Sequence, residues 1–192
     1  MIAMNTATGK KIFSIILIAV SALFLVPFLH QESKVDSNEK TVQSTLIKPT
    51  RLKIPSINVD VEVGTVGLTP DGAMEAPDDP LHVAWFSLGT LPGEKGSAVI
   101  AGHWGWKNGI AAIFDNLDRL RKGDKIYVED GEGKVVSFEV KESREYDKDA
   151  YAPEVFKSEV GVHLNLVTCV GDWDKSKKSY SKRLVVFADM VP

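Results

Sequence analysis

Three residues whose types suit covalent catalysis stand at the ends of apolar, β-branched runs in this chain of 192 residues. Cys169, the only cysteine, closes the run at 164–168, and Arg183 opens the next such run fourteen residues later. His103 follows directly on a third run, at 97–102. A thiol, an imidazole and a guanidinium at strand ends are the parts of a cysteine acyl-transfer site, and that is the site we predict.

Local geometry supports one half of this prediction. If residues 171–182 form a hairpin-type loop, the strands on either side pair antiparallel, and Cys169 and Arg183 face each other with Cβ atoms about 5 Å apart. His103 has no such local link and needs the fold to bring its strand nearby. Each residue also fits a structural role on its own: a packing cysteine in the core, an edge-strand charge, and a hydrogen-bonded histidine at a strand end.

His103 is selected by elimination from four histidines. His30 borders an apolar N-terminal run, and His82 lies in a proline-rich loop. His163 lies six residues before Cys169, which is roughly 20 Å along a strand and too far for a catalytic partner.

Short strands must position these residues, because alternating and β-branched runs dominate the chain from about residue 50. The predicted strands are 51–54, 57–63, 97–102, 125–128, 135–140, 164–170 and 184–187. One helical stretch is predicted at 111–120. Many short strands with few helices predict an all-β domain that forms a closed or nearly closed barrel. Irregular stretches at 144–161 and 171–182 flank the cysteine strand, and we expect them to wall a substrate groove.

Composition excludes several classes of function. The net charge is −3 with both signs interspersed, so no basic tract indicates nucleic-acid binding. One cysteine excludes an intramolecular disulfide and any multi-cysteine metal site. A hydrophobic content of 44% is enough for one domain with a core and an appendage.

The N-terminal part predicts a membrane anchor. Residues 12–29 carry no charge over 18 positions and follow Lys10 and Lys11, close to the length that spans a hydrocarbon core of about 30 Å. A cleaved signal peptide is the alternative, although residues 28–31 offer no small-x-small site. The lysines place residues 1–11 in the cytoplasm, so a tether at 30–49 and a catalytic domain at 50–192 lie outside the cell. A short helix is the alternative for the tether.

Taken together, these residues resemble the sortases, membrane-anchored cysteine transpeptidases of Gram-positive cell surfaces. The family pattern Thr-Leu-x-Thr-Cys reads here Asn165-Leu166-Val167-Thr168-Cys169, with asparagine in place of the first threonine. The histidine after Ala-Gly and the arginine that opens the last strand also match. Further similar stretches at 53–57, 66–72 and 92–96 extend the resemblance over roughly residues 50–190. They look closest to class F, with classes D and E as alternatives.

The resemblance implies a closed eight-stranded sortase-type β-barrel with one or two short helices, preceded by the transmembrane helix. It also implies a two-step reaction of a thiol protease and transpeptidase that anchors surface proteins to the cell wall. Cys169 would cleave an LPxTG-like sorting signal between Thr and Gly through a thioester, which an amine of a cell-wall precursor or a pilin would resolve.

The resemblance also implies the roles of the site residues. His103 would be the general acid and base and, as an imidazolium, would lower the pKa of the thiol. Arg183 would stabilise the oxyanion or hold substrate carbonyls. Thr168 and Leu166 are expected as substrate contacts. No cofactor or metal is expected, and no acidic cluster demands the calcium that some sortases use.

Two other functions stay open at this stage. An L,D-transpeptidase that cross-links peptidoglycan also uses histidine and cysteine on a β-rich fold, but its His-Gly before and Arg soon after the cysteine are missing from 168–172. The second is a non-enzymatic, membrane-tethered β-barrel binding module with a packed cysteine.

Overall fold

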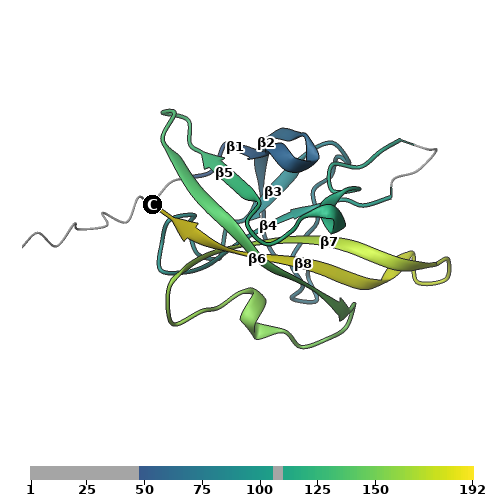
Figure 1. Cartoon of the computed structure of the whole chain (residues 1–192). Coiled ribbons are helices and arrows are strands. Elements are labelled where there is room, and N and C mark those ends of the chain that lie inside the picture. The colour runs from purple at the N-terminus through teal and green to yellow at the C-terminus, as the bar shows by residue number, and fades with distance from the viewer. Residues whose placement is uncertain (1–47, 106–109) are drawn as a thin grey trace, which may run out of the picture. The chain divides into compact units, whose positions relative to one another are not determined.

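The computed structural model describes residues 48–105 and 110–192. Strands are the main regular elements of this part of the chain (Figure 1). They are β1 (Arg51–Ile54), β2 (Val59–Val66), β3 (Val83–Phe86), β4 (Gly96–Gly102), β5 (Lys125–Glu129), β6 (Val135–Asp147), β7 (Val162–Asp174) and β8 (Ser179–Val191). Short 3-10 helices are η1 (Pro55–Ile57), η3 (Leu117–Arg119) and η4 (Pro153–Val155).

The strands close into a barrel in the order β1-β2-β3-β4-β7-β8-β6-β5, with β5 pairing back to β1. This confirms the predicted all-β closed barrel of eight strands. The pairs β2–β3 and β4–β7 are parallel, and the other pairs are antiparallel. The parallel β4–β7 pair requires the chain to leave β4, build β5 and β6, and return, so residues far apart in sequence become neighbours.

The barrel interior is filled by one face of each strand, as the period-two alternation requires. In β2, for example, Val59 and Val61 are buried while Asp60 and Glu62 are exposed. The largest fully buried side chains are Phe114, Phe138, Leu52, Ile54, Ile100, Leu117, Ile126, Leu164, Leu166, Val83, Val99 and Val128.

The predicted helix is wrong, and one strand was not predicted. The stretch 111–120 is not an α-helix, because it forms turns followed by the 3-10 helix η3. Its buried residues Phe114, Leu117 and Leu120 recur every three positions, which suits the three residues per turn of a 3-10 helix. Strand β3 was missed, because Val83, Ala84 and Trp85 are all buried and so show no alternation.

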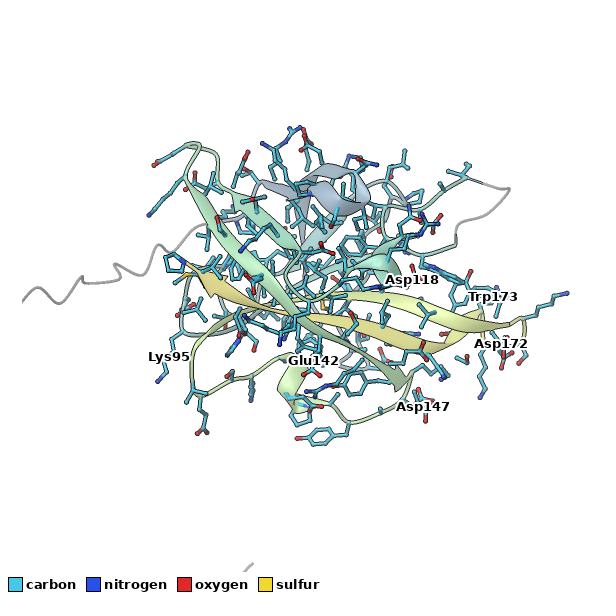
Figure 2. The ribbon with its side chains drawn as sticks, in the orientation of Figure 1. Lys95, Asp118, Glu142, Asp147, Asp172 and Trp173 are labelled. Carbon is cyan, nitrogen blue, oxygen red and sulfur yellow. The ribbon has the colours of Figure 1, made fainter. Side chains whose placement is uncertain are left out.

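The predicted loop at 171–182 is instead the outer part of a long hairpin. Strand β7 continues to Asp174 and strand β8 begins at Ser179. Both strands extend past the rest of the barrel (Figure 1). Figure 2 shows Asp172 and Trp173 on this extension. The register shifts between Val170 and Trp173, and Gly171 at this bulge has φ +86°. This ribbon covers no core, so its sequence lacks the apolar alternation that marks a barrel strand.

Gly102, the last residue of β4, is expected to tolerate no side chain. A Cβ there would lie 2.5 Å from Cδ2 of Phe114, a ring that is itself fully buried. We expect Gly102→Ala to lower the free energy of unfolding by about 1–3 kcal/mol through overpacking, measured by urea titration. The control is Gly131→Ala, where the nearest atom to a new Cβ is 3.8 Å away. Equal stability of both variants would contradict this account.

The predicted anchor at 12–29 and most of the tether at 30–49 lie outside the described residues. Within residues 48–105 and 110–192, no helix has the length and apolar character needed to cross a membrane.

Candidate active site

His103, Cys169 and Arg183 form a row along one groove, with Cys169 and Arg183 on neighbouring strands and His103 directly after β4. Cys169 of β7 pairs directly with Arg183 of β8, as the hairpin argument predicted. On the other side of β7, Ala101 of β4 pairs with Val167 in parallel register. Strand β4 ends at Gly102, so His103 follows directly on the strand that pairs with β7, and it lines the same groove as Cys169 and Arg183. The parallel pair thus supplies the link that local geometry lacked.

Alternation along β7 decides which side chains share the face of Cys169. Val167 lies on that face, and its partner Val185 of β8 forms a second, apolar row behind the first. Tyr146 of β6 pairs with Arg183 and continues the first row. The sequence analysis missed Val167, Val185 and Tyr146. The two-residue period of a strand places Val167 on the same face as Cys169, and Val185 on the same face as Arg183.

The two further predicted substrate contacts lie on the interior face of β7, but Thr168 also borders the groove and Leu166 does not. Leu166 is fully buried in the core, so it has no surface to offer a substrate and this prediction is corrected. Thr168 is also buried, and its Oγ1 donates a hydrogen bond of 2.8 Å to the carbonyl of Gly102. This bond ties the end of β4 to β7 just before His103 and Cys169.

The Cys169 thiol is only partly exposed. Burial raises the pKa of Cys169 above its ordinary value, and the positive charge of Arg183 opposes this shift. The resting cysteine is therefore a neutral thiol at neutral pH, which needs a base to become a nucleophile. These two causes of the shift do not include His103, so the lowering of this pKa by a neighbouring imidazolium stays a prediction.

This raised pKa predicts slow alkylation at neutral pH. Only the thiolate reacts with iodoacetamide, so we expect the rate to rise with pH and to have its midpoint above that of a free cysteine, about 8.5. Removing the opposing charge with Arg183→Gln is expected to move the midpoint higher still. The same chain unfolded in urea provides the reference. A midpoint at or below the unfolded value would show that burial does not control this thiol.

The His103 ring is oriented by a carbonyl on another segment. Its Nε2 lies 2.5 Å from the carbonyl oxygen of Pro77, and because a carbonyl can only accept, Nε2 carries the hydrogen. In the neutral ring Nδ1 is then the nitrogen without a hydrogen. The carbonyl of His103 itself accepts from the Phe114 amide at 3.0 Å, which holds the backbone after β4.

Arg183 is braced by its own strand. Nη1 donates to the carbonyls of Lys182 and Tyr180 at 2.9 and 3.2 Å, and Nη2 lies 3.4 Å from Oγ of Ser179. A guanidinium has five N–H groups, so these bonds leave donors for a carbonyl oxygen above Cys169.

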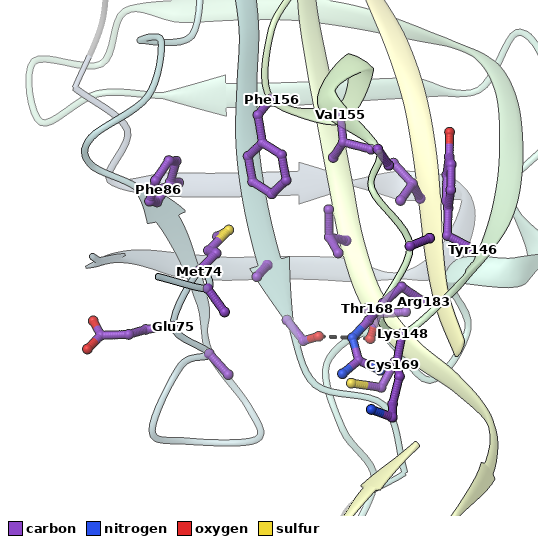
Figure 3. Close-up of a pocket in the computed structure, with 18 of the residues that line it drawn as sticks. Met74, Glu75, Phe86, Tyr146, Lys148, Val155, Phe156, Thr168, Cys169 and Arg183 are labelled. Atoms are coloured by element: carbon purple, nitrogen blue, oxygen red, sulfur yellow. Dashed lines mark hydrogen bonds between the residues drawn. The ribbon is translucent and has the colours of Figure 1, made fainter. Parts of the chain in front are cut away.

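The row stands at one end of a groove of about 540 Å³. Figure 3 shows Cys169, Arg183 and Lys148 together, with Phe86, Phe156 and Met74 further along the groove. Phe86 and Phe156 meet edge to face at a centroid distance of 5.9 Å. The groove is thus polar at the thiol and apolar beyond it, which suits an extended peptide with an apolar side chain upstream of the reacting bond.

One wall of the groove is fastened to the cysteine strand by Asn165. Its Nδ2 donates to the carbonyl of Val155 in η4 at 2.6 Å, and Val155 and Phe156 line the groove. The stretch 144–161, predicted as a groove wall, therefore does flank the groove, although its first residues belong to β6. In the part of the chain that the structure describes, no cluster of three or more His, Cys, Asp or Glu residues could hold a metal ion.

This arrangement has the geometry for acyl transfer to and from a thiol. Comparison with known proteins agrees with this chemistry, because residues 52–191 match the Sortase domain family. This chain belongs to the sortase family. Membership argues against the L,D-transpeptidase alternative.

Individual sortases are similar to this chain over part of its length. Sortase A of Bacillus anthracis is 36% identical over 97 residues, which make up 50% of this chain and 41% of that protein, so less than half of the relative's length is spanned. The structure of sortase C-1 from Actinomyces oris has 27% identity and a TM-score of 0.56 over 76% of each chain. Sortase A from Corynebacterium diphtheriae, at 22% identity, shares the fold with a TM-score of 0.56 over 78% of this chain and 63% of its own.

Proposed function

We propose that this sortase is a cysteine transpeptidase that cleaves an LPxTG-like signal between Thr and Gly and passes the threonine acyl group to an amine. The observation that carries this proposal is that His103, directly after β4, lines the same partly apolar groove as Cys169 of β7 and Arg183 of β8. The apolar part offers a place for the upstream residues of the signal.

The proposed reaction uses only side chains of the chain and its two substrates. Cys169 passes its proton to Nδ1 of His103 as Sγ attacks the threonine carbonyl carbon, and Arg183 donates to the oxyanion. When the C–N bond to glycine breaks, His103 returns that proton to the leaving amine, and a thioester remains. An acceptor amine then attacks the thioester and loses a proton through His103, which regenerates the thiol.

The partners follow from this chemistry. The acyl donor is a surface protein that carries the sorting signal, and the acceptor is an amine of the cell-wall precursor or a lysine of a pilin. The predicted anchor at 12–29 would hold the domain at the outer face of the membrane. The assignment to class F, with classes D and E as alternatives, rests on the sequence stretches at 53–57, 66–72 and 92–96.

The test is a transfer assay with the full chain in detergent micelles. A peptide that contains Leu-Pro-x-Thr-Gly is mixed with triglycine as the acceptor, and enzyme and products are analysed by mass spectrometry. We expect the peptide up to threonine as an adduct on Cys169 and then joined to triglycine. A folded protein that gives neither adduct nor product with a library of such signals would overturn the proposal.

A further inference from the structure

Strands β4 and β8 do not pair with each other, because β7 lies between them. One side chain nevertheless connects β8 to the segment that follows β4. Oη of Tyr180, at the start of β8, donates a hydrogen bond of 3.0 Å to the carbonyl of Gly105, two residues after His103. The ring of Tyr180 also meets Trp104 edge to face, at a centroid distance of 5.1 Å.

The same residue braces Arg183 through its backbone. The carbonyl of Tyr180 accepts from Nη1 of Arg183 at 3.2 Å. On its other side, the Tyr180 ring meets Trp173 of β7 at 5.0 Å, and Trp173 is also the register partner of Tyr180. Tyr180 therefore contacts the segment after His103 with its side chain and the guanidinium with its main chain.

Both backbone polar groups of Gly105 are hydrogen-bonded. Its N–H donates to Oδ1 of Asp115 at 2.7 Å, and its C=O accepts from Tyr180. Gly105 has φ +59°, and a Cβ there would lie 2.5 Å from Oη of Tyr180. The absence of a side chain at residue 105 is what permits the contact. Burial together with the nearby Cys169 and Asp115 raises the pKa of Tyr180, so its hydroxyl stays a donor at neutral pH.

From this geometry we infer that Tyr180 is a positioning residue, which fixes the His103-bearing segment and the Arg183 guanidinium relative to each other on the two sides of Cys169. The role in turnover rests on the proposed transpeptidation. Proton transfer depends steeply on placement, and a misplacement of 1 Å can cost orders of magnitude in rate. Without the Tyr180 hydroxyl, the segment after β4 keeps the Asp115 bond and the contact between the Trp104 and Tyr180 rings, but loses the hydrogen bond from Tyr180 to the carbonyl of Gly105.

The first test is Tyr180→Phe in the full chain. This variant keeps the ring contacts and the backbone bond to Arg183, and removes only the link to Gly105. We expect kcat to fall about three- to tenfold with KM within about twofold of wild type, the size that one hydrogen bond supplies. We also expect the NMR signals of the His103 ring, assigned with His103→Gln, to shift and broaden without substrate. Tyr127→Phe on β5 is the matched loss of a hydroxyl away from the site.

The second test is a double-mutant cycle with Gly105→Ala. In the wild type the new Cβ meets the Tyr180 hydroxyl at 2.5 Å, whereas Cζ of the same ring lies at 3.4 Å. Removing the hydroxyl relieves this clash, while the strain of alanine at positive φ is present in both backgrounds. We expect Gly105→Ala to lower kcat about tenfold in wild type and less than about threefold in Tyr180→Phe.

The outcomes separate this inference from the proposed function. Unchanged His103 signals and kcat in Tyr180→Phe, effects equal to those of Tyr127→Phe, or additive losses in the cycle would each overturn the positioning role. If the wild type forms no thioester, the proposed function fails. The His103 signals still decide whether Tyr180 places the imidazole, because that measurement needs no substrate.

Discussion

Replacing Cys169 with alanine is expected to abolish both thioester formation and transfer, a loss of roughly 10⁴- to 10⁶-fold in kcat. The reason is chemical: the proposed intermediate is bonded to Sγ, and alanine has no atom that can form it. The loss should appear in kcat at every substrate concentration. The assay is the transfer reaction described above, followed by the mass of the intact enzyme.

The same variant should fold normally. Cys169 lies near the end of the barrel part of β7 and is only partly exposed, and the substitution removes a single sulfur atom. We expect a melting temperature within a few degrees of wild type. Cys169→Ser is a useful second variant, because it keeps an atom of nucleophilic type with a much higher pKa. Transfer by Cys169→Ala at more than a trace of the wild-type rate would exclude the thioester route altogether.

The barrel could be predicted because most of its strands have one face in the core and one in solvent. Strands β1, β5 and the first part of β6 show this alternation plainly. The predicted bounds of β1 and β5 agree with the structure to within one residue, whereas β6 begins at the predicted residue but continues to Asp147 instead of ending at residue 140. Strand β3 has no such signal, because it is short and buried on both faces. The β7–β8 extension has none either, because it leaves the barrel and has no core to cover.

The candidate site also has a part that the sequence could predict and a part that it could not. Cys169 and Arg183 could be paired from sequence because hairpin register depends on where the turn is centred, even though much of the supposed loop is strand. His103 could not be placed, because its neighbour β7 is reached only after two intervening strands, and no local rule fixes such a parallel pair. Tyr180 was passed over for a related reason: it lies in a polar stretch whose strand character comes only from pairing with β7.

Arg183→Lys is the sharper test of how the site works, and we expect it to lower kcat about 100- to 1,000-fold, the loss typical of one oxyanion donor. The guanidinium bonds at once to the carbonyls of Lys182 and Tyr180 and still has N–H groups to offer the substrate. The N–H donors of an ammonium all lie on one nitrogen. Lysine therefore cannot keep the hydrogen bonds to these two carbonyls and at the same time donate to an oxyanion above Cys169.

Alkylation of Cys169 separates charge from geometry in this variant. Lysine keeps a positive charge near the thiol, so the pH midpoint of alkylation should stay close to wild type, whereas Arg183→Gln should raise it. Arg119→Lys in η3, on an exposed part of the surface, is the matched control and should leave both transfer and alkylation unchanged. If Arg183→Lys retains transfer within about threefold of wild type, far below the loss of an oxyanion donor, Arg183 acts on the thiol through its charge alone.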